Sequence, residues 1–172
     1  MDFGSNYIVL SLLEEAFAAG RSIIYGTTST GAHISDFFAR LKENNYQAIS
    51  ADELVNALLK HEQLPEKSIV ITIDDGYDDN YTYAFMTAKK YQMIMNFMIP
   101  TRLIGKPGYM NWDHLREMHN NEYARIYNHT ATHAPLGYIL KGQITTELTD
   151  SSEDFKRELG FDTHIFAYPY GS

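Results

Sequence analysis

The apolar pattern is strongest at residues 69–73, where five consecutive apolar or β-branched side chains lead into Asp74, Asp75 and Gly76. A short continuous run of this kind, bounded by turn residues, is typical of a strand buried on both faces, as in a parallel sheet. Ligands of α/β folds bind at the carboxyl ends of such strands, so the two carboxylates lie where chemistry is expected. A strand-to-helix turn with a capping aspartate explains the same residues. The run alone leaves both interpretations open.

The rest of the chain alternates between helical and strand patterns. Apolar residues at helical spacing predict helices at 6–19, 35–44, 51 to about 61, 79–91, 111–118 and about 145 to 159. Short β-branched or aromatic runs predict strands at 22–25, 46–49, 93–99, 123–127 and 164–168. Ser35 is expected to cap the second helix, and Ser50 with Glu53 to form a capping box on the third. This order predicts an α/β fold with a mostly parallel sheet, in one domain over 1–172.

Composition narrows the classes of function. The chain has 172 residues, a net charge of −8 and no cysteine. The acidic balance argues against nucleic acid as a partner, and the absence of cysteine excludes disulfides, thiolate zinc sites and thiol catalysis. The apolar stretch at 6–19 is interrupted by Glu14 and Glu15, is too short to span a membrane and has no basic flank. It predicts an amphipathic helix, neither a membrane span nor a recognisable signal peptide.

Two histidines follow another predicted strand. His129 and His133 are spaced i and i+4, and on a helical turn this spacing would place both imidazoles on one face. Because they follow a strand, they are expected on the same edge of the sheet as Asp74 and Asp75. One carboxylate and two imidazoles leave open positions on a zinc-like cation, which is the pattern of a catalytic metal site. A single histidine is more often a surface residue, but the combination favours a metal site.

Three segments carry a resemblance to a known family. The segment 72–76 (Thr-Ile-Asp-Asp-Gly) resembles the Thr-Phe-Asp-Asp-Gly motif of the polysaccharide deacetylases, also called NodB-homology or carbohydrate esterase family 4 enzymes. The segment 128–133 (Asn-His-Thr-Ala-Thr-His) resembles their His-Ser/Thr-x-x-His motif, and 166–171 (Phe-Ala-Tyr-Pro-Tyr-Gly) is similar to their third motif. The form of the third motif is similar to the branch that de-N-acetylates poly-β-1,6-N-acetylglucosamine in biofilms.

The resemblance implies a role for each matching residue. Asp75, His129 and His133 would bind a divalent metal ion, zinc first, with cobalt or nickel as alternatives, and Asp74 would be the general base. Pro169 and Tyr170 would line the substrate groove, and the backbone N–H of Tyr170 would help to hold the oxyanion. The implied reaction is hydrolysis of N-acetyl groups on an N-acetylglucosamine polysaccharide, with release of acetate. The implied location is extracellular or at the cell surface.

The chain also departs from the family pattern. Ala167 stands where the third motif usually carries an arginine, and Gly26 where relatives of this branch often have a histidine. Family members continue with two further motifs, one of which supplies a protonating histidine, so the C-terminal part of the family domain is expected to be absent from 1–172. An impaired relative that only binds metal or glycan, and an amidohydrolase of small amides, therefore remain alternatives.

The family fold is a distorted (β/α) barrel, and the predicted elements supply five or six of its strands. An open barrel exposes a sheet edge and part of a core. We expect this edge to be left open in a truncated product, covered by the helix at 6–19, or hidden in a homo-oligomer.

Overall fold

The computed structural model describes residues 23–27 and 32–171, and the helix predicted at 6–19 lies outside the described residues. The strands are β1 (Ile23–Thr27), β2 (Gln47–Ala48), β3 (Ser68–Ile73), β4 (Met95–Ile99) and β5 (Ala124–Asn128). The α-helices are α2 (Ala32–Glu43), α3 (Ala51–Lys60), α4 (Met86–Tyr91), α5 (Trp112–His119) and α6 (Lys141–Leu159). Short 3-10 or π-helical segments are η1 (Asn80–Phe85), η2 (Thr101–Leu103), η3 (Leu136–Tyr138) and η4 (Pro169–Gly171).

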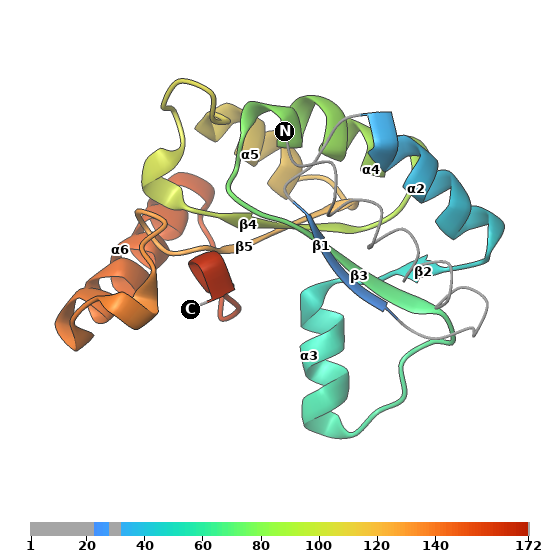
Figure 1. The fold of residues 1–172 in the computed structure, drawn as a ribbon, viewed down its shortest axis with the longest axis horizontal. Helices are drawn as coiled ribbons and strands as arrows, with labels where there is room; N and C mark the ends of the chain where they lie inside the picture. The colour runs from blue at the N-terminus through green and yellow to red at the C-terminus, as the bar shows by residue number, and fades with distance from the viewer. Residues whose placement is uncertain (1–22, 28–31, 172) are drawn as a thin grey trace.

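All pairings between the named strands are parallel, and the sheet is open (Figure 1). Its main order is β1-β3-β4-β5, and the short β2 pairs with the beginning of β3. The fold is therefore α/β with a parallel sheet, as the sequence predicts, and it forms part of a barrel. Because the strands are parallel, the loops that follow β3, β4 and β5 all emerge at one rim.

The main core lies on one face of the sheet. Alternate strand residues point to this face, where α2, α4 and α5 lie side by side (Figure 1). The fully buried strand side chains in this core include Ile69, Ile71, Ile73, Met95, Phe97 and Ile99. Among the described residues, the opposite face carries a small buried cluster of Ala51, Met98 and Tyr127, against which Ile165 and Ala167 pack. The apolar side chains of Leu58 and Leu59 on α3 remain 65% and 74% exposed.

This one-sided core agrees with the expected open barrel. Whether the helix predicted at 6–19 or a second copy covers the open edge stays a prediction. None of the helices in the described part of the chain has both the length and the apolar character needed to cross a membrane.

A buried asparagine joins β2, β3 and β4. The beginning of β3 pairs with β2 and its end pairs with β4, where Thr72 lies opposite Asn96. The fully buried side chain of Asn96 donates to the carbonyl oxygens of Ile71 and Ile49, at 2.9 and 3.3 Å, and accepts from the N–H of Ala51 at 2.9 Å. These bonds satisfy backbone groups where β2 and β4 meet along the same edge of β3.

Several predicted boundaries hold and others are wrong. The capping box on α3 is confirmed, since the Glu53 N–H donates to Ser50 Oγ and the Ser50 N–H donates to the Glu53 carboxylate. Ser35 is not a cap: α2 begins at Ala32, and the Ser35 hydroxyl instead bonds to the Tyr91 hydroxyl at 3.1 Å. The helix predicted at 79–91 is present, but its first part is the π-helical η1.

Two predictions near the C-terminus also need correction. The helix α6 begins at Lys141, four residues earlier than expected, because the side chain of Gln143 accepts the N–H of Leu140 and closes the first turn. The strand predicted at 164–168 does not form. This segment meets β5 only at one isolated bridge between Asn128 and Phe166, so it adds no full strand to the sheet.

Replacing Asn96 with alanine should lower the free energy of unfolding by about 3 kcal/mol, because three buried backbone groups lose their partner. Urea denaturation followed by circular dichroism measures this. Asn120→Ala is the matched control, since the Asn120 side chain makes an exposed bond to the Arg116 carbonyl and should cost under about 1 kcal/mol. Equal costs for the two variants would contradict the proposed role of Asn96.

Candidate metal centre

Three potential ligands come together at the rim where the strands end. Asp75 lies two residues beyond β3, His129 directly follows β5, and His133 ends the loop that His129 begins. Their ligand atoms all lie within 4.8 Å of one another. The Nε2 atoms of His133 and His129 lie 3.0 and 3.5 Å from Asp75 Oδ1, and the ring centroids are 4.8 Å apart. The structure thus places the three predicted ligands as one cluster.

A carbonyl oxygen fixes the orientation of His129. Its Nδ1 lies 3.0 Å from the Ala167 carbonyl oxygen, which can only accept a hydrogen bond. The proton of the neutral ring therefore belongs on Nδ1, and the lone pair of Nε2 points toward Asp75. This arrangement, in which the second ring nitrogen is held by an acceptor, is typical of a metal-binding histidine. His129 is also buried, at 2% exposure, so its ring has little freedom to turn.

Asp75 and Gly76 turn the chain sharply after β3. Both have left-handed backbone angles, with φ of 75° and 72°. A Cβ at Gly76 would lie 3.1 Å from Ile104 Cδ1 and 3.5 Å from Ile99 Cδ1. Glycine is thus required at position 76 both for its backbone angle and for space. The turn directs the Asp75 carboxylate back toward the two histidines.

Asp74 presents a carboxylate oxygen with no assigned partner. Its Oδ1 is buried and has no hydrogen bond among the described residues. Burial raises the pKa of Asp74 above its ordinary value, His129 acts in the opposite direction, and the neighbouring Asp75 adds to the rise. A carboxylate beside the cluster with one buried, unpartnered oxygen is a candidate proton acceptor, because the protein leaves part of its hydrogen-bonding capacity unused.

The protonation of the cluster suits a cation. The two imidazoles, His129 most of all, lower the pKa of Asp75 against the opposing effect of burial. Burial lowers the pKa of His133, although Asp75 works against this shift. Both shifts favour an ionised carboxylate beside a neutral imidazole, which are the forms that bind metal. Two histidines and one aspartate that converge in this way fit a divalent cation such as zinc.

The loop that carries the histidines is not the helical turn predicted from their spacing. Thr130 and His133 have φ of 68° and 65°, which a helix cannot contain. The Thr130 hydroxyl instead accepts the His133 N–H at 3.1 Å and closes a compact turn. The prediction that the two rings converge is confirmed. The helical turn that was expected to bring them together is wrong.

The third motif lies beside His133. The ring of Tyr170 meets the His133 ring edge-on at 4.7 Å between centroids, while Pro169 is buried. Tyr170 has φ of 58°, so its ring is presented by another left-handed turn and stays 75% exposed. Across the rim, Tyr77 stacks on Tyr109 at 5.0 Å. Exposed aromatic faces thus flank the cluster.

The sequence missed several residues that hold the site. The Ala167 carbonyl orients His129, yet Ala167 drew attention only as the place of a missing arginine. Glu147 on α6 accepts the N–H and the hydroxyl of Thr132, inside the histidine loop. Backbone acceptors leave no signal in a sequence. A polar stripe on α6 was the one available hint, since Glu147, Ser151 and Asp154 recur at helical spacing.

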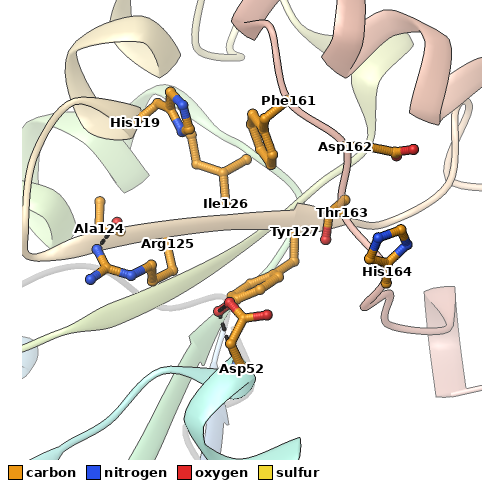
Figure 2. Close-up of a pocket in the computed structure, with 10 residues that line it drawn as sticks. All are labelled: Asp52, His119, Ala124, Arg125, Ile126, Tyr127, Phe161, Asp162, Thr163 and His164. Carbon is orange, nitrogen blue, oxygen red and sulfur yellow. Dashed lines mark hydrogen bonds between the residues drawn. The ribbon is translucent and has the colours of Figure 1, made fainter. Parts of the chain in front are cut away.

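The pocket drawn in Figure 2 is separate from this cluster. It encloses about 310 Å³ at the amino end of β5 and contains none of the candidate ligands. Its lining includes Asp52 and His164, and Figure 2 shows the Tyr127 hydroxyl hydrogen-bonded to Asp52, at 2.7 Å. Burial and this bond raise the pKa of Tyr127. His164 therefore faces a site away from the metal centre.

Comparison with known proteins points in the same direction as the geometry. The family model described as polysaccharide deacetylase matches residues 61–172. YxkH of Bacillus subtilis, named as a polysaccharide deacetylase, is 30% identical over an alignment of 156 residues, and the match covers 87% of this chain and 56% of that protein. The poly-β-1,6-N-acetyl-D-glucosamine N-deacetylase of Escherichia coli K12 is 23% identical over 78% of this chain and 26% of that protein.

A solved structure shows the same fold. The deacetylase PplD of Streptococcus pyogenes, in complex with acetate, superposes with a TM-score of 0.73 at 23% identity, over 86% of this chain and 71% of that chain. At this identity the likeness supports the fold alone. The chain spans about half the length of the Bacillus subtilis relative and about a quarter of the Escherichia coli one.

Gly76→Ala should destabilise the protein by about 1–3 kcal/mol, because the new methyl group meets Ile104 and the backbone angle is unfavourable for alanine. Gly142→Ala is the matched control. Gly142 lies in the first turn of α6 with no atom within 4 Å of the added carbon, so alanine should stabilise by up to about 1 kcal/mol. Thermal unfolding of both variants checks the opposite signs, and a stable Gly76→Ala variant would refute the account of this turn.

Proposed function

The chain belongs to the polysaccharide deacetylase family, and on that premise we propose that it catalyses metal-dependent removal of N-acetyl groups from an N-acetylglucosamine-containing polysaccharide. The observation that carries the proposal is the convergence of Asp75, His129 and His133 next to the unpartnered carboxylate of Asp74. Two imidazoles and one carboxylate on one side of a cation leave its other side open to water and substrate, which suits catalysis.

Asp75, His129 and His133 would hold the divalent cation, with zinc as the first choice and cobalt or nickel as alternatives. When bound, such an ion polarises an amide carbonyl and lowers the pKa of water. The Ala167 carbonyl keeps His129 in the tautomer that leaves its Nε2 free for this role. The geometry of the three residues thus supports a ligand set, and the family resemblance assigns the same residues.

Asp74 is the proposed general base. Its carboxylate would take a proton from the water that adds to the acetamide carbon, because it lies beside the candidate ligands Asp75 and His129. The backbone N–H of Tyr170 is the proposed donor to the oxyanion that develops at the former carbonyl. The carbon–nitrogen bond then breaks, the amine nitrogen gains a proton and acetate leaves.

The proposed substrate is a polymer of N-acetylglucosamine. Support comes from the name of the Escherichia coli relative and from the exposed rings of Tyr77 and Tyr170 beside the cluster, since aromatic faces suit sugar rings. Such a polymer lies outside cells, in biofilms, so we propose an extracellular or cell-surface location. We further propose that 1–172 form one domain of the NodB-homology type.

One observation favours a second candidate, an impaired relative that binds metal or glycan without turnover. Ala167 stands where the family usually has an arginine, and Asp74 Oδ1 has no hydrogen bond within the described residues. Without the arginine side chain of the family motif nearby, the Asp74 carboxylate would be less well oriented as a base. The two candidates differ in one measurable property, which is acetate release.

We expect the protein to release acetate from poly-β-1,6-N-acetylglucosamine or chitooligosaccharides when Zn²⁺, Co²⁺ or Ni²⁺ is added. Asp74→Asn should lower kcat by at least about 100-fold, because the proton acceptor is lost, while metal affinity stays nearly unchanged. Asp36→Asn removes the same charge from an exposed position on α2 and should behave as the unaltered protein. Enzymatic assay of free acetate measures the rates.

Metal binding without metal-dependent acetate release would favour the impaired relative. Turnover of short amides without preference for sugars would instead indicate an amidohydrolase of small substrates. Equal rates for Asp74→Asn and Asp36→Asn would show that Asp74 is not the base.

A further inference from the structure

One residue of α6 accepts several bonds from the middle of the histidine loop. The N–H of Ala131 donates to the Glu147 carbonyl oxygen at 3.1 Å, and the N–H of Thr132 donates to the Glu147 carboxylate at 2.8 Å. The Thr132 hydroxyl donates to the other carboxylate oxygen at 2.7 Å. Ala131 and Thr132 lie between the two candidate ligands, so Glu147 holds the chain that connects His129 to His133.

A second contact from α6 reaches the start of the loop. Ser151 lies one turn beyond Glu147, is fully buried and donates its hydroxyl to Asn128 Oδ1 at 2.9 Å. The same oxygen accepts the Thr130 N–H at 2.7 Å. Asn128 directly precedes His129, so this pair of bonds fixes the backbone on both sides of the first imidazole.

The turn after β4 holds the loop from the other side. The N–H groups of Thr101 and Arg102 donate to the carbonyl oxygens of Thr130 and Ala131, at 3.3 and 2.8 Å. This turn is itself bound to α6, because the Thr101 hydroxyl donates to the Asp154 carboxylate at 2.8 Å. The helix α6 therefore contacts the histidine loop directly and also through a second segment.

These bonds explain how an unfavourable loop conformation persists. Thr130 and His133 both adopt left-handed backbone angles, which are uncommon for residues other than glycine. Such conformations persist when the surrounding structure determines them. Each N–H from His129 to His133 has a partner, and two of the five donate to Glu147.

We propose that Glu147 is a positioning residue of the metal centre, which holds the loop 129–133 in the conformation that directs both imidazoles toward Asp75. The inference rests on the metal site of the proposed function and adds a residue to it that touches none of the three ligand side chains. Carboxylate charge strengthens bonds from N–H and O–H donors, so a charged acceptor suits this task. Ser151 supports the same loop at Asn128.

The test measures Zn²⁺ and Co²⁺ affinity by competition titration. Glu147→Ala should lower the affinity about 10–100-fold, the usual effect of losing an outer partner of a metal site. Glu147→Gln, which keeps an acceptor for the Thr132 N–H, should recover most of the loss. Glu153→Ala is the matched control, because Glu153 is an exposed acid on the same helix and should leave the affinity unchanged. Equal affinities for Glu147→Ala and Glu153→Ala would overturn the proposal.

A second measurement does not depend on metal. Amide hydrogen exchange in metal-free protein should accelerate at Thr132 in Glu147→Ala, because its N–H loses the carboxylate acceptor, with the core strands unchanged. The Ala131 N–H donates to the backbone carbonyl of residue 147, which the substitution keeps. Thr132→Ala removes only one bond from an exposed side chain, and this variant replaces Glu147→Ala in the test if Glu147→Ala does not fold. Thr132→Ala should weaken metal binding about threefold to tenfold. If the unaltered protein binds no metal, the proposed function fails, and amide exchange alone decides this inference. Unaltered exchange at Thr132 would then overturn it.

Discussion

The parallel direction of the strands is the constraint on which the candidate site depends. Since β3, β4 and β5 run the same way, their following loops emerge at one rim and bring residues about fifty positions apart into contact. Asp75 comes from the first of these loops, and His129 and His133 come from the last. The loop between them, after β4, binds the backbone of the histidine loop. In an antiparallel sheet of the same order, the loop after β4 would emerge at the opposite end and could not bind the histidine loop.

Within that frame, the site is built from backbone geometry that helices and strands do not supply. Asp75, Gly76, Thr130, His133 and Tyr170 all have left-handed angles. Each of them redirects the chain at the rim, so that side chains point across it. These turns are held by tertiary contacts: Gly76 by the packing of Ile99 and Ile104, the histidine loop by α6, and His129 by a carbonyl from the 161–171 segment. The conformation of the site therefore depends on these tertiary contacts.

The sequence predicted the five strands of the sheet and the cluster of three candidate ligands because both rest on local patterns. The β-branched run at 69–73 and the acids after it could be interpreted without any partner, as could the capping box of Ser50 and Glu53. The sequence did not predict features that depend on contacts between residues far apart along the chain. Nothing near Thr132 indicates that Glu147 accepts its N–H, and nothing near 164–168 shows that the segment meets β5 at a single bridge. The helical turn assigned to the two histidines was wrong because periodicity cannot detect left-handed residues.

The most direct test of the central claim is a crystal structure of the protein grown with Zn²⁺, with anomalous diffraction recorded at the zinc absorption edge. The account predicts one ion bonded to the Asp75 carboxylate and to Nε2 of both His129 and His133, with the Asp74 carboxylate beside it and not bonded. An ion bound elsewhere, or bonded to His129 through Nδ1 in place of the Ala167 carbonyl contact, would contradict it.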